Sequence, residues 1–307
     1  MGRPTLLAIG TLGLYTETPL HCGAESATGY VDLPVQRERH TGYPLIPGST
    51  LKGVLRDEMK LETRLGDAEV RRLFGSDTSD EKSPSPGIVS FGDGVLVAFP
   101  IRSSGAPFHW VTCPFVLERV FRALGLSVAA VQAPEKGAAW AKTEGEVLLE
   151  EIRLIKKPKP DFFGDGPAIG LTRLMSLLPG ADRGFGYTRE IFPERLLILD
   201  DEDFKELVDV GTEVLTRIKL NALGTTTNIP EGEHPEIQGA DRQGNLFVEE
   251  VVPPETLFLA SLRAYGNKGK LIENLQELAI FRVGGDETIG RGLTHLAWVP
   301  AEARKAG

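Results

Sequence analysis

Residues 31–56 read VDLPVQRERHTGYPLIPGSTLKGVLR and predict an extended segment, a turn and then a helix. The extended part ends at Pro47, because a proline disfavours helical geometry at the residue before it. Ser49 is able to cap a helix that starts near Thr50. The apolar residues that follow at helical spacing are Leu51, Val54, Leu55, Met59 and Leu65. We therefore expect a helix that buries one side and continues toward Phe74.

Strand patterns flank this stretch. Residues 5–17, TLLAIGTLGLYTE, alternate in the manner of an opening strand, and residues 88–102, IVSFGDGVLVAFPIR, predict a strand pair that turns at Gly92–Gly94. The same strand–helix–strand theme returns in the second half of the chain. It predicts an α+β fold with an antiparallel sheet, built either as two ferredoxin-like units or as one elaborated unit.

Two segments interrupt this pattern. Residues 157–193 are crowded with proline and glycine around a short apolar patch, which predicts an insertion that projects from the core. Residues 221–245 are polar and show no apolar periodicity. So long a polar stretch inside a compact protein is usually a functional loop, a projecting hairpin or a disordered segment.

The net charge of −9 on 307 residues disfavours a free nucleic-acid-binding protein, but the charge is unevenly spread. Residues 200–213 hold seven acids against one lysine, and Asp200 or Asp201 is placed to cap a helix there. Residues 36–60 hold five cationic against three acidic side chains, a local balance of +2. Because a binding groove depends on local charge, nucleic-acid binding stays open.

The cysteines and the apolar runs argue against several classes of protein. Cys22 and Cys113 lie 91 positions apart, without a CxxC pair or a histidine at metal-ligand spacing. This pattern disfavours a disulfide scaffold and a structural zinc site. No apolar run reaches the roughly 18 residues of a membrane span, and no basic segment with a cleavable apolar stretch opens the chain. We expect a cytoplasmic protein without a membrane partner.

Three short stretches carry residue types that bind phosphate. In residues 282–293, RVGGDETIGRGL, glycines let the backbone approach an anion and arginines add forked donors. Residues 47–56 join a helix N-terminus to cations one turn apart, and residues 36–40, QRERH, add further cationic side chains. Taken singly, each has a structural alternative, namely a turn, a capped helix and a solvated loop. The candidate contacts are Arg37, Arg39, His40, Ser49, Thr50, Lys52, Arg56, Gly284, Gly285 and Arg291.

Acids in predicted loops are the candidates for chemistry. Asp32 precedes the basic stretch, and Glu249 and Glu250 follow the long polar segment. A carboxylate beside a basic groove is able to hold a divalent metal or to assist proton transfer. His21 is a second acid–base candidate by its side-chain type. The structural alternative is a loop acid without a catalytic part.

In this order, the stretches resemble the RAMP superfamily. The resemblance covers nearly the whole chain as a single domain, residues 1–307, and within the superfamily it is closest to the family of fourth subunits of the Cmr, or type III-B, CRISPR effector complexes. It rests on residues 31–56 together with GIVSFGDGVLVAFPIRS (87–103), RLLILDDEDFKELVDVGTEVLTRIKL (195–220), LFVEEVVPPETLF (246–258) and GGDETIGRGL (284–293).

The resemblance implies an RRM-like, or ferredoxin-like, palm built from both halves of the chain, with helical insertions and a projecting thumb hairpin at residues 221–246. It implies a backbone subunit that stacks with other copies of itself in a helical filament along a CRISPR RNA, beside the other Cmr subunits. Each thumb disturbs the duplex of guide and target RNA at regular intervals. The implied activity is that of an endoribonuclease that cuts the target RNA there and needs a divalent metal ion, Mg²⁺ or Mn²⁺.

Residue by residue, the resemblance places Asp32 at the position whose carboxylate is needed for cleavage and would bind the metal. His21 falls where relatives also have a histidine. The RERH, PGSTLKG and glycine-rich positions match contacts to the backbone of the guide RNA. In two places the chain departs from the family, since Val251 stands where relatives often have an aromatic residue and residues 157–193 have no clear counterpart.

Three rival interpretations remain beside this one. The first is a non-catalytic, structural backbone subunit that binds the guide RNA. The second is the backbone subunit of the related Csm complex, which the LLILDDEDFKELV and TGYPLIPGS stretches disfavour. The third is a nucleotide-binding enzyme, and it is disfavoured because no glycine-rich turn here ends in GK[ST].

Overall fold

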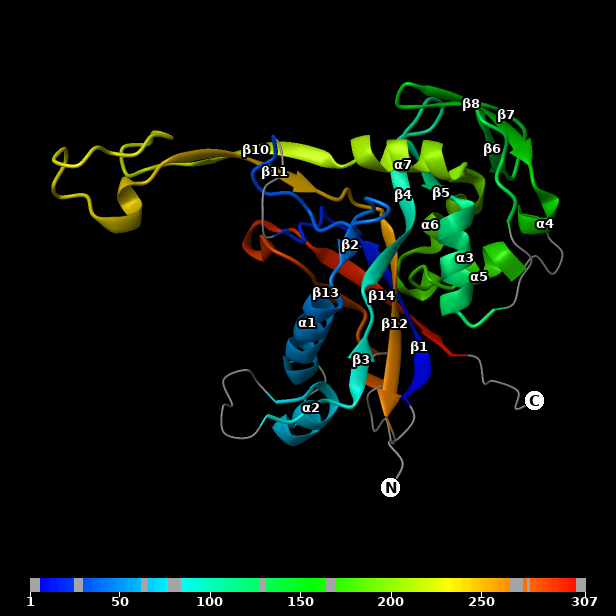
Figure 1. Ribbon diagram of the computed structural model, residues 1–307, viewed down its shortest axis with the longest axis horizontal. Helices are drawn as coiled ribbons and strands as arrows, with labels where there is room; N and C mark the ends of the chain where they lie inside the picture. The colour runs from blue at the N-terminus through cyan, green and yellow to red at the C-terminus, as the bar shows by residue number, and fades with distance from the viewer. Residues whose placement is uncertain are drawn as a thin grey trace.

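The computed structural model describes residues 6–24, 30–61, 66–76, 84–126, 131–163, 169–265, 273–274 and 277–301. In these residues a twelve-stranded sheet runs through the molecule, helices pack against it, and a two-stranded arm projects to one side (Figure 1). The strands are β1 (Leu6–Thr16), β2 (Leu45–Ile46), β3 (Val89–Phe91), β4 (Gly94–Arg102), β5 (Phe108–Thr112), β6 (Ala138–Ala141), β7 (Gly145–Leu149), β8 (Ile152–Pro158), β9 (Leu196–Ile198), β10 (Glu213–Lys219), β11 (Asn245–Val251), β12 (Leu257–Tyr265), β13 (Ile280–Arg282) and β14 (Leu293–Pro300). The α-helices are α1 (Gly48–Leu61), α2 (Asp67–Phe74), α3 (Pro114–Ala123), α4 (Pro160–Phe163), α5 (Ile169–Met175), α6 (Gly186–Arg195) and α7 (Asp201–Val210), and the 3₁₀ turns are η1 (Ala181–Arg183), η2 (Gly239–Arg242) and η3 (Glu287–Ile289).

The first half of the sheet is antiparallel throughout. Its strands lie side by side in the order β13, β14, β1, β12 and β4. The predicted opening strand is confirmed as β1, whose residues 9–16 are all buried. Gly13 is glycine because a Cβ there would lie 2.0 Å from the carbonyl oxygen of Leu177, on the segment that packs across the strand.

The second half of the sheet is mixed. Beyond its contact with β12, β4 pairs with β5, and the order continues through β9, β6, β8 and β7. The pairs β5–β9 and β6–β8 are parallel, so the prediction of an antiparallel sheet holds for most pairs only. The long connection from β5 to β9, through α3 and several further elements, permits the parallel pairing. The α+β class is confirmed, and the ferredoxin-like arrangement of the palm stays a prediction.

The turn at Gly92–Gly94 does not form the predicted strand pair. β3 and β4 both pair with β12, at Leu262 and Leu259 respectively, and therefore lie end to end along one neighbour. The reason is that the turn displaces the chain without reversing it. Its Asp93 carboxylate instead accepts a hydrogen bond of 2.7 Å from the Gly48 N–H at the start of α1.

Helix α1 begins earlier than predicted. Ser49 is exposed inside its first turn, so the predicted cap at Ser49 is wrong, and the Asp93 side chain takes that part. The buried residues of α1 are Gly48, Leu51, Leu55 and Met59. The expected continuation to Phe74 is also wrong, because Gly66 adopts an extended backbone (φ −64°, ψ 151°) and the separate helix α2 follows it.

Residues 157–193 do not project from the core. The described residues of this range contain α4, α5, η1 and most of α6, and most of their apolar side chains belong to the main buried cluster or pack against it. Leu174 and Phe192 are fully buried there. The prolines and glycines divide this segment into short helices without preventing burial of the apolar residues between them. That the segment is an insertion relative to the family stays a prediction.

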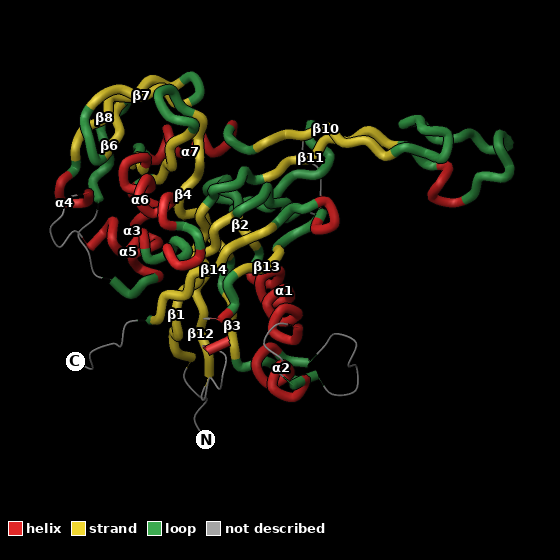
Figure 2. The backbone as a smooth tube through the Cα atoms, turned by 180° about the vertical axis from the view of Figure 1, so that it is seen from behind, coloured by secondary structure: helices red, strands yellow, loops and turns green. Residues whose placement is uncertain are grey.

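The arm consists of β10 and β11, paired from Glu213↔Val251 to Lys219↔Asn245, and both views show it extending away from the rest of the molecule (Figures 1 and 2). Residues 221–246 form its far end and the start of its return strand. At that end Asn221 is buried, with its Nδ2 donating to the Thr227 carbonyl at 2.7 Å. None of the helices in the part of the chain described is long and apolar enough to cross a membrane.

Candidate functional site

Asp32 lies where the loop before β2 joins the root of the arm, and its side chain is exposed. Its N–H and that of Leu33 donate to the Val248 carbonyl at 3.1 and 3.0 Å. The Val248 N–H in turn donates to Asp32 Oδ2 at 2.8 Å. One carboxylate oxygen is thus held by β11, while Oδ1 makes no hydrogen bond with the described residues. This arrangement orients the carboxylate and leaves one oxygen for a ligand.

His21 approaches the same strand from the loop after β1. It is buried, and its Nδ1 donates to the Glu250 carbonyl at 2.8 Å. Its own carbonyl accepts a hydrogen bond of 2.8 Å from the Gly285 N–H. A Cβ on Gly23 would lie 2.9 Å from His21 Nε2, so the ring is also enclosed on that side. His21 therefore joins three segments of chain at the root of the arm.

Glu249 is the centre of a buried charge cluster. Its side chain is 0% exposed, and Oε2 lies 2.6 Å from Arg291 Nη1 and 3.0 Å from Arg217 Nη1. Arg217 also bonds Asp286 at 2.5 Å, and Glu249 Oε1 lies 3.7 Å from His21 Nδ1. Burial, followed by contact with Asp286, raises the pKa of Glu249 against the effect of the arginines. The cluster joins both strands of the arm to the glycine-rich turn.

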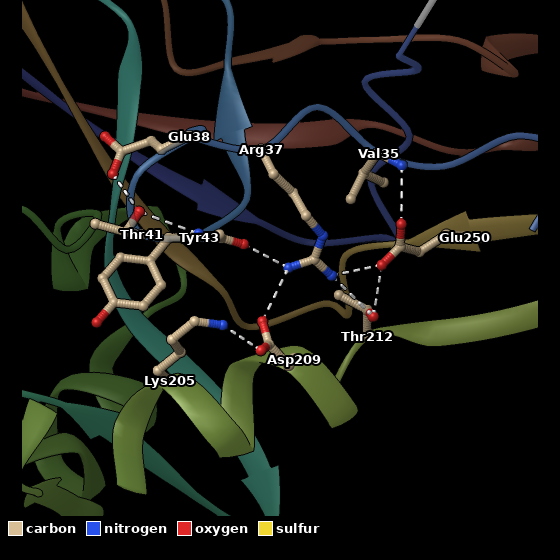
Figure 3. A network of polar contacts seen from close by, with 10 residues as sticks. Val35, Arg37, Glu38, Thr41, Tyr43, Lys205, Asp209, Thr212 and Glu250 are labelled. Atoms are coloured by element: carbon tan, nitrogen blue, oxygen red, sulfur yellow. Dashed lines mark hydrogen bonds and ion pairs between the residues drawn. The ribbon is translucent and has the colours of Figure 1, made fainter. Parts of the chain in front are cut away.

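Glu250 points to the other face of β11 and binds Arg37 (Figure 3). Its Oε1 accepts hydrogen bonds from Arg37 Nη2 at 2.5 Å and from the Thr212 hydroxyl at 2.7 Å. Its Oε2 accepts one of 3.0 Å from the Val35 N–H. Burial raises the pKa of this carboxyl, but the bonds from Arg37, Val35 and Thr212 outweigh it and the net shift is downward. Glu250 is therefore a stabilised buried anion.

The RERH loop exposes only some of its charges. Glu38 accepts two bonds from Arg119, at 2.8 and 2.5 Å, and one of 2.7 Å from Thr41. Arg39 and His40 are exposed at the tip of the turn. Arg39 forms no ion pair with any described residue, and His40 Nε2 lies 3.9 Å from Glu38 Oε2. The loop is thus anchored through residues 37 and 38 and presents the next two to solvent.

The candidate contacts on α1 lie apart from this root. Ser49 is exposed, and Thr50, Lys52 and Arg56 are half-buried. Arg56 Nη1 donates to the Ser76 carbonyl at 3.5 Å. The Asp93 carboxylate already occupies the first N–H of the helix, and its negative charge competes with any phosphate there. The negative charge of Asp93 therefore makes the helix N-terminus less suited to bind phosphate than the side-chain cations and hydroxyls of α1.

The glycine-rich turn packs against the His21 loop. Gly284 has φ +88°, and a Cβ there would lie 2.3 Å from the His21 carbonyl oxygen, so no larger residue fits. Gly285 supplies the N–H that binds the same oxygen. The Arg291 side chain is 11% exposed and faces Glu249. These internal contacts account for Gly284, Gly285 and Arg291, whose contact with RNA stays a prediction.

Thr212, Arg217 and Asp286 belong to this site, although no motif in the sequence indicated them. The adjacent acids Glu249 and Glu250 were one signal in the sequence. Successive residues of a strand face opposite sides, so each of the two acids needs its own partner on its own face. Arg217 lies diagonally across the arm from Glu249, since Leu215 is the residue paired with it. That register depends on the fold and cannot be taken from the sequence.

The donor groups for a divalent ion are few. Among the residues that the structure covers, no group of three or more His, Cys, Asp or Glu side chains is placed to hold a metal. Glu249 and Glu250 are bound to arginines, which leaves the free oxygen of Asp32. Mg²⁺ at phosphate sites commonly takes one or two carboxylates and completes its shell with phosphate oxygens and water. The residues therefore fit an ion shared with RNA, and they do not form a site by themselves.

Comparison with known proteins identifies the family. The family model of the RAMP superfamily matches residues 14–295. The chain is 33% identical over 297 residues to the CRISPR system Cmr endoribonuclease Cmr4 of Pyrococcus furiosus, covering 92% of each chain. The crystal structure of oligomeric Cmr4 from Pyrococcus furiosus superposes with a TM-score of 0.68 at 27% identity, over 97% of this chain and 100% of that one.

A further structural likeness concerns the fold alone. A cryo-EM structure of type III-B Cmr-beta bound to cognate target RNA contains a chain with a TM-score of 0.69 at 23% identity, covering 96% of this chain and 98% of its own. The predicted family is confirmed by the sequence matches and by the fold together. The chain belongs to the RAMP superfamily and, within it, to the Cmr4 family.

Proposed function

We propose that the chain is a backbone subunit of a type III-B CRISPR ribonucleoprotein, which binds CRISPR RNA and cuts complementary target RNA at regular intervals. The observation that carries the proposal is the exposed Asp32 carboxylate, held by the Val248 N–H at the root of a projecting arm. The Pyrococcus relative is named an endoribonuclease, which supports this chemistry. We place this activity in the cytoplasm, within the assembled complex.

The arm is the part suited to disturb a duplex. A-form RNA holds its backbone in a geometry in which the 2′-hydroxyl is not in line with the adjacent phosphodiester. An arm that enters between base pairs forces a nucleotide out of the stack and releases that constraint. Because Asp32 is bonded to the arm's own strand, the carboxylate and the displaced nucleotide are held in one frame.

Cleavage then follows as an internal transfer. Asp32 accepts the proton of the 2′-hydroxyl, the 2′-oxygen bonds to phosphorus, and the bond from phosphorus to the 5′-oxygen breaks. The products are a 2′,3′-cyclic phosphate and a 5′-hydroxyl, which takes up a proton. In the alternative role of Asp32, its free oxygen would hold a divalent ion, Mg²⁺ or Mn²⁺, together with the RNA, and the ion would stabilise negative charge on the phosphate oxygens. His21 is buried, and its contacts support β11, while its catalytic part stays a prediction.

Guide binding is assigned to side chains of the RERH loop and of α1. Arg39 and His40 at the loop tip and Lys52 and Arg56 on α1 are placed for contacts with the RNA backbone that carry no sequence information. The net charge of −9 opposes binding of free RNA by one copy. We therefore propose that affinity builds up in a helical filament of copies of this chain together with the other Cmr subunits.

Substitution of Asp32 in the assembled complex tests the function. Asp32→Asn keeps an oxygen acceptor for the Val248 N–H but removes the negative charge. We expect roughly 100-fold slower cleavage of a matched target, which is the lower end of the range for loss of a general base. Guide binding should be unchanged. Denaturing gels with end-labelled target measure the rate and show whether the product ends in a cyclic phosphate.

Metal removal provides the complementary test. Chelation should stop cleavage while the guide RNA remains bound. If Asp32→Asn and Asp32→Ala both cut every site at the native rate, the catalytic assignment of Asp32 is wrong.

A further inference from the structure

We propose that Arg37 is a positioning residue, which clamps the Asp32 segment to the root of the β10–β11 arm through Glu250, and not a contact to RNA. The inference rests on the proposed function for its catalytic consequence. Its structural part stands on the contacts of Arg37 alone (Figure 3).

Both terminal nitrogens of Arg37 bind groups of the protein. Nη2 donates to Glu250 Oε1 at 2.5 Å and lies 3.3 Å from the Thr212 hydroxyl. Nη1 donates to the Gly42 carbonyl at 2.7 Å and lies 3.8 Å from Asp209 Oδ1. The side chain is 24% exposed. A phosphate that took the place of the Glu250 carboxylate on this guanidinium would leave that carboxylate buried without its cation.

The acceptor of this bond connects the segments that matter for cleavage. Glu250 is on β11, two residues after Val248, whose N–H holds the Asp32 carboxylate. Thr212 immediately precedes β10, the other strand of the arm, and also binds Glu250. The Val35 N–H, three residues after Asp32, completes the set. The Glu250 carboxylate on β11 thus ties the residue before β10 to Val35 and Arg37, which follow Asp32 in the chain.

Backbone hydrogen bonds join the same two segments as the clamp. The Glu250 N–H donates to the Leu33 carbonyl at 2.9 Å, and the Leu33 N–H donates to Val248 at 3.0 Å. The Leu33–Glu249 pairing is an isolated bridge, and the Gln36 N–H also donates to the Cys22 carbonyl at 2.7 Å, so the side-chain clamp adds to a small set of backbone bonds. Without Arg37, Glu250 loses its cation, and the loop that carries Asp32 is expected to move relative to the arm.

Arg39 offers the matched comparison. It lies two residues away on the same loop, is exposed, and has no ion pair among the described residues. If Arg37 positions and Arg39 binds RNA, alanine at the two sites must produce opposite defects. Arg102→Ala is the neutral control, because it removes an exposed arginine from a surface ion pair with Glu150 on another part of the sheet.

The first measurement is hydrogen exchange on the purified native-length protein without RNA. Arg37→Ala and the isosteric Glu250→Gln should each speed amide exchange roughly tenfold in peptides covering 30–36 and 245–251, as expected for loss of a charge-assisted hydrogen bond. Arg37→Lys should restore little of the protection, since an ammonium group cannot bind Gly42 and Glu250 in the fork of a guanidinium. Arg39→Ala and Arg102→Ala should leave these peptides unchanged.

The second measurement uses reconstituted complexes with guide RNA and matched target. Arg37→Ala should reduce the cleavage rate at saturating target by roughly 10- to 100-fold, the effect of a misplaced catalytic group, with unchanged guide affinity. Arg39→Ala should instead weaken guide affinity. A circular-dichroism melt confirms that each variant is folded, and Glu250→Gln replaces Arg37→Ala if the latter is not.

The outcomes separate the two proposals. Native exchange in both Arg37→Ala and Glu250→Gln overturns the clamp, whatever the nuclease activity. Lower guide affinity with a native cleavage rate in Arg37→Ala also overturns it and returns Arg37 to the RNA surface. Faster exchange in a system where even the native complex leaves target RNA intact supports the clamp and contradicts the proposed function.

Discussion

Glu249 and Glu250 are neighbours on β11, yet their carboxyl groups have opposite shifts in pKa. Successive side chains of a strand point to opposite faces, so Glu249 enters the cluster with Arg217 and Arg291, and Glu250 enters the one with Arg37. Burial and the adjacent Asp286 raise the pKa of Glu249. At Glu250 the effect of burial is outweighed by the hydrogen bonds that the anion accepts.

This difference predicts how stability depends on pH. A carboxyl whose folded-state pKa is depressed stabilises the fold above its unfolded pKa, and this stabilisation is lost as the pH falls through the folded pKa. We expect Glu250→Gln to lower the free energy of unfolding by about 2 kcal/mol at neutral pH. The difference in free energy of unfolding between this variant and the native chain should then become smaller in acid, below about pH 4. Urea unfolding at a series of pH values measures this difference.

Glu118→Gln is the control for this prediction. Glu118 forms an i,i+4 pair with Arg122 and is 59% exposed, so its removal should change stability little at any pH. If the loss in free energy of unfolding caused by Glu250→Gln stays constant or grows as the pH falls, the depressed pKa of Glu250 is contradicted.

At the scale of elements, α1 is stabilised by a residue from another part of the chain. The Asp93 carboxylate accepts a bond from Gly48, which is 45 positions away, and places negative charge at the helix N-terminus. The same turn separates β3 from β4 along β12. The turn that holds Asp93 therefore determines both where α1 begins and where β4 follows β3 along β12.

Substitution at Asp93 tests that link. We expect Asp93→Ala to lower the free energy of unfolding by about 1 kcal/mol, as for loss of a capping side chain. Asp93→Asn keeps an acceptor and should lose less. Thermal unfolding of the two variants and of the native chain measures these differences in stability. Equal stability of all three would show that the contact between Asp93 and Gly48 contributes nothing.

At the scale of the whole molecule, the end of the arm is independent of the core. In the described structure, every hydrogen bond of residues 221–244 joins residues within that range, with Asn221 and Arg242 at its centre. The root is bound by two charge clusters on opposite faces of β11. The arm is thus rigidly rooted and separately folded at its tip.

This division predicts the effect of shortening the arm. Replacing residues 220–244 with Asn-Gly joins the paired residues Lys219 and Asn245 through a two-residue hairpin turn. We expect the melting temperature to change by no more than about 2–4 °C. In reconstituted complexes, guide binding should persist, while cleavage falls by roughly tenfold or more because the displaced nucleotide is no longer held. Native cutting by the shortened chain would show that the arm does not disturb the duplex.

Much of the fold could be predicted from the order of residues. Apolar alternation predicted β1, and apolar residues at helical spacing predicted α1 although not its ends. The acids before an amphipathic run predicted that Asp200 or Asp201 caps α7, and Asp200 is the cap, since it accepts bonds from the Glu202 and Asp203 N–H groups. These features are local, since each depends on backbone preferences and on residues within one or two turns.

The sequence by itself determined the element types, the family resemblance and the candidate carboxylate, Asp32. Tertiary structure alone decided the partners of the charges, because Arg37 and Glu250 are 213 positions apart and meet only where the loop packs on β11. The basic loop and the glycine-rich turn predicted contacts of Arg37 and Arg291 with RNA, and the structure adds that both side chains lie in ion pairs within the protein. A buried cation must be paired or pay a large desolvation cost, and which acid pairs with it depends on the register and packing of distant segments.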